Sequence, residues 1–301
     1  SAGFEVVGHV HLDTAPLSNA VVGAWFGDCK LQGDIKAAAE KADEWADVVW
    51  ALAEEHLSEL VLWVCGFPCR ELSSVKVDRG GLDSGDSKRF NEAKQLYAAL
   101  LKLSHGRKAK LKSIWENVQS MRTEVRDRIT KELRELNPSI EVVGICASGS
   151  HWCRRPRWWW CDDYVARMDD ETERTESGAR HLFVRLPLPP LEGILKEGWA
   201  PTWAGNASRR FGTFTRSAPM DKEPSRPKDL ATASAKAKER WAADKWRFSP
   251  YQYEDEWGVV DAAGTWRRLD GDERVAMLGW PKEYLAPPGH RSLTDDEKCS
   301  I

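Results

Sequence analysis

Apolar residues recur every three or four positions in several parts of the chain, which is the period of a helix with one buried face. The pattern is clear in residues 36–56, where Ala42, Trp45, Val49 and Leu52 would share a face. Short apolar runs between such stretches predict strands. We expect helices over residues 36–56, 88–104, 126–136, 231–246 and 270–278, and strands over residues 60–65, 112–116 and 140–146.

Strands that alternate with helices of ten to twenty residues predict an α/β fold with a wound, largely parallel sheet. The periodicity fails from about Val165. A charged run at residues 169–174 and proline-containing segments at residues 186–190 and 222–228 predict an irregular region there. We therefore divide the chain into residues 1–164, 165–247 and 248–301.

Composition narrows the function classes. The 301 residues carry a net charge of −3, so any contact with nucleic acid must come from local patches such as Arg154–Arg157 or Arg209–Arg210. Seven irregularly spaced cysteines are typical of reduced intracellular thiols rather than a disulfide framework. The sequence contains no run of about 20 apolar residues, so it indicates no membrane span. Several of the 16 tryptophans, including Trp45, Trp50, Trp63 and Trp115, are expected in the core.

A candidate nucleophile follows the apolar run at residues 60–65. The loop Gly66-Phe67-Pro68-Cys69 would present Cys69 at the carboxyl end of a strand, where ligands bind in open α/β sheets. Pro68 fixes its own φ and would hold the cysteine in a defined turn. Taken alone, a buried cysteine acting as a small hydrophobe is the more common situation. The segments further along the chain change this interpretation.

Three segments follow in order: Glu116-Asn117-Val118, then Arg155-Pro156-Arg157, then residues 268–273 running into Leu278-Gly279-Trp280-Pro281. With the Pro-Cys loop, this ordered set resembles the DNA (cytosine-5) methyltransferases, and its spacing is most similar to the de novo-type enzymes. The resemblance covers nearly the whole chain, loosely at residues 165–245. It implies a Rossmann-like S-adenosylmethionine-dependent methyltransferase sheet with helices on both faces and a smaller, irregular target-recognition insertion. Residues 1–164 would be the catalytic core, residues 165–247 the target-recognition region, and residues 248–301 a return to the core.

The resemblance also implies the reaction, which is transfer of a methyl group to C5 of a flipped-out cytosine through a covalent Cys69 adduct. A thiolate that adds at C6 makes C5 nucleophilic. Glu116 would then support N3, and Arg155 and Arg157, two apart in an extended segment, would face the same pocket. Residues implied to support the loop or the substrate are Pro68, Ser73, Asn117, Thr213 and Arg216.

The implied cofactor is S-adenosylmethionine, with candidate contacts at His11, Asp13, Asp34, Ile35 and Phe67. His11 stands where the family has an acid for the ribose hydroxyls, and Asp13 lies two positions later on the same face. The chain starts after the family's Phe-x-Gly-x-Gly-Gly loop and ends before its Gly-Asn-Ser segment. We therefore expect a fragment that lacks parts of the cofactor pocket.

Two alternatives remain open. The chain could be a catalytically inactive methyltransferase-like module that binds DNA or another protein. A His9-x-His11 pair near a strand end could instead hold zinc, as in metal-dependent hydrolases. We expect the methyltransferase, with no metal, with double-stranded DNA as its partner and RNA as the less favoured substrate. A methyltransferase-like partner subunit, no membrane association and an intracellular, nuclear location complete the expectation.

Overall fold

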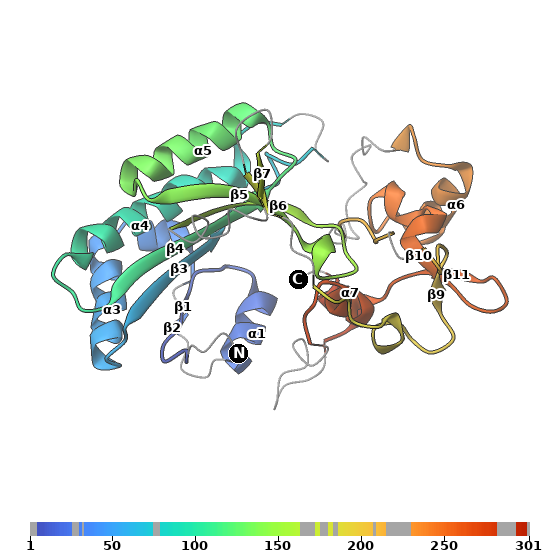
Figure 1. Cartoon of the computed structure of the whole chain (residues 1–301), viewed down its shortest axis with the longest axis horizontal. Helices are drawn as coiled ribbons and strands as arrows, with labels where there is room; N and C mark the ends of the chain where they lie inside the picture. Colours follow the sequence, from blue (N-terminus) through green and yellow to red (C-terminus); the bar gives the residue numbers. More distant parts are fainter. Residues whose placement is uncertain are drawn as a thin grey trace. The chain divides into compact units, whose positions relative to one another are not determined.

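A computed structural model describes residues 5–25, 30–31, 33–74, 79–162, 172–174, 180–182, 186–206, 209–214, 230–281 and 293–299. The chain divides into two compact units, each with its own core (Figure 1). The first unit comprises residues 1–145 and 156–183, and the second comprises residues 146–155 and 184–301.

The first unit is built on a six-stranded sheet of order β3-β4-β6-β5-β8-β7. Strand β3 runs parallel to β4, β4 antiparallel to β6, β5 parallel to β8, and β7 antiparallel to β8. The strands are β3 (Leu60–Gly66), β4 (Lys110–Val118), β5 (Ile140–Cys146), β6 (Pro156–Asp162), β7 (Thr172–Arg174) and β8 (Arg180–Leu182). Strands β1 (Val10–His11) and β2 (Lys30–Leu31) form a separate parallel pair.

The α/β class predicted from the sequence is confirmed, but the sheet is mixed rather than largely parallel. The segment between β5 and β6 spans only residues 147–155. A parallel crossover needs a dozen or more residues, so a connection this short favours a reversal of chain direction. The reversal gives β6 its antiparallel pairing with β4.

Helices α4 (Arg89–Ser104) and α5 (Thr123–Leu136) lie over the sheet of the first unit (Figure 1). The unit also contains α1 (Pro16–Trp25), α2 (Ile35–Ala39), α3 (Ala42–Glu55) and the short 3₁₀ helix η1 (Gly85–Lys88), whereas the 3₁₀ helix η2 (Ala147–Gly149) belongs to the second unit. The helix predicted over residues 36–56 is broken at Lys41, with φ −128°. The side chain of Gln95 in α4 donates to the carbonyl of Ala39 at 2.9 Å and satisfies the end of α2. A bond over this sequence separation cannot be seen in local periodicity.

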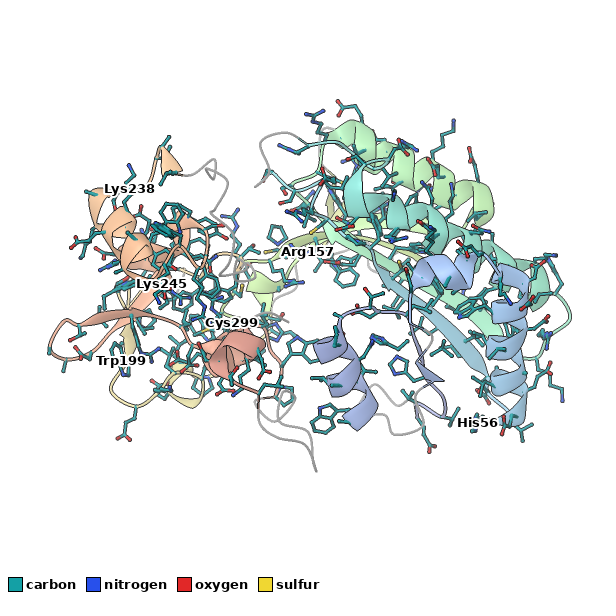
Figure 2. All side chains as sticks on the ribbon, turned by 180° about the vertical axis from the view of Figure 1, so that it is seen from behind. His56, Arg157, Trp199, Lys238, Lys245 and Cys299 are labelled. Atoms are coloured by element: carbon teal, nitrogen blue, oxygen red, sulfur yellow. The ribbon has the colours of Figure 1, made fainter. Side chains whose placement is uncertain are left out.

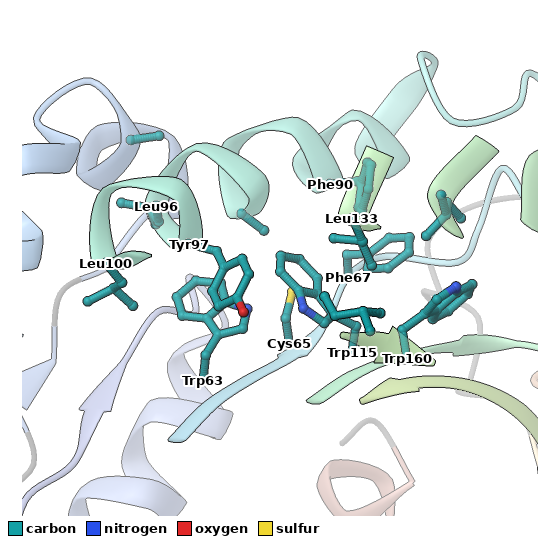
Figure 3. Packing of buried hydrophobic residues seen from close by; sticks show 14 of the residues in the cluster. Trp63, Cys65, Phe67, Phe90, Leu96, Tyr97, Leu100, Trp115, Leu133 and Trp160 are labelled. Carbon is teal, nitrogen blue, oxygen red and sulfur yellow. The ribbon is translucent and has the colours of Figure 1, made fainter. Parts of the chain in front are cut away.

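Aromatic rings form the centre of this core (Figure 3). The rings of Trp63 and Trp115 lie 5.6 Å apart, and Tyr97 from α4 lies 6.2 Å and 5.5 Å from them. The buried indole of Trp50 donates to the carbonyl of Leu100, which ties α3 to α4. On the other face of β3, Leu62 and Val64 are 49% and 65% exposed. Among the described residues, the helix layer therefore covers one face of this strand.

The second unit holds a three-stranded antiparallel sheet with short helices around it. Its apolar residues form two clusters, one around Phe211 and Val259 and one around Trp241 and Phe248. Its elements are η5 (Leu191–Gly193), β9 (Ala200–Pro201), α6 (Ala235–Ala243), η7 (Pro250–Tyr253), η8 (Asp255–Trp257), β10 (Gly258–Val260), β11 (Trp266–Arg268), α7 (Gly271–Met277) and α8 (Asp295–Lys298).

The compact units follow other boundaries than the three parts predicted from the sequence. Residues 248–281 belong to the second unit, together with residues 186–206. The functional division at residues 164 and 247 stays a prediction. No helix in the described part of the chain is both long and apolar enough to cross a membrane.

Candidate active site

The loop that carries Cys69 begins where β3 ends, and three successive carbonyl groups in it accept hydrogen bonds. Asn117 Nδ2 donates to the carbonyl of Phe67 at 2.9 Å, and Ser87 Oγ donates to the carbonyl of Pro68 at 2.9 Å. The backbone N–H groups of Leu72 and Ser73 donate to the carbonyl of Cys69 at 2.9 Å and 2.8 Å. The cysteine itself is partly exposed. The backbone is therefore fixed at and before a cysteine that solvent can reach.

Asn117 is well placed to hold this loop because its own amide is fixed. It lies near the end of β4 and is only 1% exposed. Its Oδ1 accepts the N–H of Val118 at 2.8 Å, which directs Nδ2 at the Phe67 carbonyl. This contact agrees with the loop-supporting role predicted for Asn117.

An ion pair lies beside the loop. Glu116 is the β4 partner of Gly66 in the parallel register, and a Cβ added at Gly66 would lie 3.5 Å from the Glu116 carboxylate. Arg157 on β6 reaches the same carboxylate, with Nε 2.5 Å from Oε1 (Arg157 is labelled in Figure 2). The two side chains are 23% and 12% exposed. The structure thus brings Cys69, Glu116 and Arg157 into the same unit, on three neighbouring chain segments.

The other predicted contacts to substrate lie in the second unit or outside the described residues. The carbonyl of Arg155 accepts the N–H of Ala147 at 3.3 Å within the second unit. The hydroxyl of Thr213 donates to the carbonyl of Arg154 at 2.7 Å, which ties two segments of that unit together. Arg216 falls outside the described residues. The roles of Arg155, Thr213 and Arg216 toward substrate stay predictions.

Three of the predicted cofactor residues, Asp13, Asp34 and Ile35, lie around the starts of two helices. Asp13 Oδ1 accepts the N–H of Ala15 at 2.8 Å, just before α1. Asp34 Oδ1 accepts the N–H of Lys36 at 3.0 Å and caps α2, which starts at Ile35. Both carboxylates therefore have a structural task in addition to any contact with a ligand.

His11 is the more open candidate for a ligand contact. Its Nε2 is buried and has no hydrogen-bond partner among the described residues, which is consistent with a polar group such as a ribose hydroxyl meeting it. Its ring lies 5.8 Å from that of His9. Burial, and then the neighbouring His11, lower the pKa of His9. In the described residues no three His, Cys, Asp or Glu side chains gather as potential metal ligands.

The described cysteines differ in exposure: Cys69 and Cys146 are partly exposed, and the other four are buried. Burial, and then the charge of Glu116, raise the pKa of Cys65 to about 12. Burial raises the pKa of Cys161 to about 11. None of the six described cysteines is in a disulfide. Of Cys65, Cys69 and Cys161, only Cys69 is partly exposed. Exposure to solvent suits a nucleophile.

Two residues at the site were not found from the sequence. Ser87 is fully buried and holds the carbonyl of Pro68, and Glu71 is 8% exposed and accepts hydrogen bonds from the turn that follows the cysteine. The only sequence signal near them is the concentration of glycine at positions 80, 81 and 85.

Comparison with known proteins gives structural likeness only. No protein-family model matches the chain, and no curated protein matches it. Among solved structures, a mutant of Spodoptera frugiperda DNMT2 is 13% identical with a TM-score of 0.49 over 98% of this chain and 87% of that one. The Entamoeba histolytica methyltransferase EhMeth is 11% identical with a TM-score of 0.47, covering 97% and 83%. The S. pombe Dnmt2 methyltransferase is 14% identical with a TM-score of 0.44, covering 98% and 85%. At these identities and TM-scores the likeness does not extend to the reaction of this chain.

Proposed function

We propose that this chain is a cytosine-5 methyltransferase that acts on double-stranded DNA through a covalent adduct on Cys69. One observation carries the proposal. A partly exposed cysteine sits on a backbone held from β4 and η1, beside a carboxylate and a guanidinium that are already paired on β4 and β6. Nucleophile, acid and cation are the groups that addition to a cytosine ring requires.

Each group has a balanced task in the reaction. The cytosine must leave the stack before its C6 can be reached. The Cys69 thiolate forms a bond to C6, the electron pair moves toward N3 and O2, and Glu116 shares a proton with N3. Arg157 stabilises the charge that develops at O2. After C5 has received the methyl group, its proton passes to a base and the thiolate leaves, which restores the aromatic ring.

S-adenosylmethionine supplies an electrophilic methyl group on a sulfonium when it is bound. We infer that His11 and Asp13 would meet its ribose, Asp34 its adenine and Phe67 its apolar surface. The orphaned Nε2 of His11 supports this assignment. The ring of Phe67 packs 5.0 Å from that of Phe90, so Phe67 is held in place by the core.

Duplex DNA is the proposed substrate and RNA the competing one, because the motif spacing is most similar to the de novo-type enzymes. The patch expected at Arg209 and Arg210 is partly occupied within the second unit. Arg209 pairs with Glu256 at 3.3 Å, and Arg210 lies 4.9 Å over the ring of Trp152. Nuclear location and a methyltransferase-like partner subunit belong to the same proposal.

The test is transfer of a labelled methyl group from S-adenosylmethionine to duplex DNA, with duplex RNA in parallel. Mass spectrometry of the digested product should find 5-methylcytosine with the wild-type chain and none with Cys69→Ser. If the RNA is methylated and the DNA is not, the substrate is RNA rather than DNA. DNA binding without product, in the wild type as in Cys69→Ser, would favour the inactive-module alternative.

A further inference from the structure

We propose that Ser87 is a positioning residue for Cys69, which acts through the carbonyl of Pro68 to hold the nucleophile in its attacking position. The catalytic part of this inference rests on the proposed function, whereas the positioning part rests on geometry alone.

The contact of Ser87 is made directly at the peptide bond that joins Pro68 to Cys69. Its Oγ donates to the Pro68 carbonyl at 2.9 Å, and the side chain is fully buried. Proline has no N–H, so the preceding peptide unit, Phe67–Pro68, can be hydrogen-bonded only through the Phe67 carbonyl. Asn117 fixes the preceding carbonyl, that of Phe67. The two side chains together restrain two successive peptide planes before the thiol.

The same short segment makes a second contact to the loop. Ser87 lies in η1, and α4 begins two residues later at Arg89. Phe90 in the first turn of α4 is fully buried, and its ring packs 5.0 Å from that of Phe67. The start of α4 therefore holds the residues before Cys69 by one polar and one apolar contact.

A turn with a buried carboxylate brings Ser87 to this position. Glu71, two residues after Cys69, accepts the N–H of Gly80 and the hydroxyl of Ser84, each at 3.4 Å. A Cβ added at Gly80 would lie 1.9 Å from Ser84 Oγ, so a larger residue would push this turn away. Gly85 has φ +50° and directly precedes Asp86 and Ser87 in η1. The chain after the cysteine thus folds back onto the cysteine's own loop.

Loss of the Ser87 hydroxyl removes this donor from the Pro68 carbonyl, in a bond that is partly buried. Such a hydrogen bond contributes about 1 kcal/mol, which corresponds to roughly a fivefold change in a local opening equilibrium. The amide hydrogens of the loop should therefore exchange faster. The Pro68–Cys69 peptide plane also loses a restraint in the closed loop, so the thiol should sample a wider range of positions.

The test compares Ser87→Ala with Ser104→Ala. Ser104 is a matched control because its hydroxyl also donates to a backbone carbonyl, that of Leu101 at 2.7 Å, at the far end of α4. Ser84→Ala is a second variant, which removes the hydroxyl contact to Glu71 and should give a smaller change of the same kind. Hydrogen exchange is followed in peptides covering residues 67–74, with peptides from β5 as the internal reference.

We expect exchange in residues 67–74 to become about fivefold faster in Ser87→Ala and to stay within twofold of wild type in Ser104→Ala. At saturating DNA and S-adenosylmethionine, kcat should fall in Ser87→Ala, by at most about fivefold, while the Kd for DNA stays within twofold. Unchanged exchange in Ser87→Ala would overturn the proposal. Faster exchange with unchanged kcat would overturn its catalytic part. If the wild type shows no methyl transfer at all, the proposed function fails, and the exchange measurement still decides the positioning of the loop.

Discussion

The ion pair between Glu116 and Arg157 should contribute to stability as a coupled unit. Its atoms lie 2.5 Å apart, and the side chains are only 23% and 12% exposed. At an effective dielectric constant of about 20, two unit charges at this separation attract by about 7 kcal/mol. Desolvation of both ions offsets most of that gain. We therefore expect a net coupling free energy of about 1 to 3 kcal/mol.

A double-mutant cycle measures this coupling. The free energy of unfolding in urea is determined for the wild type, Glu116→Gln, Arg157→Met and the double variant. A parallel cycle on Asp43 and Lys102 is the control, since that pair has a 2.7 Å separation but side chains that are 62% and 65% exposed. The exposed pair should couple by less than about 1 kcal/mol and lose even that at high salt. Equal coupling in the two cycles would refute the reasoning from burial.

Three further predictions concern individual residues. At pH 8 iodoacetamide should label Cys69 in the folded chain and leave Cys65 unlabelled, because burial raises the pKa of Cys65 to about 12; equal labelling rates would contradict this. The raised pKa of Cys65 also makes stability depend on pH: its contribution is fully present below pH 9, the ordinary pKa of a thiol, and is lost as the pH rises through about 12. The urea midpoint of unfolding should therefore fall above pH 9, and a midpoint that does not change with pH would contradict this. Asp162→Ala should destabilise the first unit by about 3 kcal/mol, since Asp162 accepts both the N–H and the hydroxyl of buried Ser113 at 2.9 Å; a loss below about 1 kcal/mol in urea unfolding would argue against it.

The part of the site on parallel strands was predictable from the sequence. Cys69 follows the apolar run at residues 60–65, Glu116 ends the strand predicted over residues 112–116, and the carboxyl ends of neighbouring parallel strands lie at the same edge of a sheet. In the structure Gly66, at the end of β3, pairs with Glu116 on β4 in the parallel register. The position of Arg157 could be predicted only through the resemblance, because its strand is antiparallel to β4.

Features that depend on contacts between distant segments were not predictable. The end of α2, just before the break at Lys41, is bonded by Gln95, 54 positions beyond Lys41 (95 − 41), and no residue in the segment itself signals this contact. Ser87 is an ordinary residue type in a glycine-rich turn, and only its bond to Pro68 distinguishes it. The local pattern of apolar residues predicts which face of a helix or strand is buried. It does not predict which distant segment packs on that face, and the contacts of Gln95 and Ser87 depend on that packing.

Covalent trapping tests the central claim most directly. The chain is mixed with S-adenosylmethionine and duplex DNA that carries 5-fluorocytosine, and the mixture is analysed for a protein–DNA adduct stable to denaturant. The fluorine at C5 cannot leave as a proton does, so an active enzyme accumulates as the methylated adduct. We predict an adduct with the wild type, linked at Cys69 by peptide mapping, and none with Cys69→Ser. An adduct that persists in Cys69→Ser, or none with a wild-type chain that methylates normal DNA, would contradict the account.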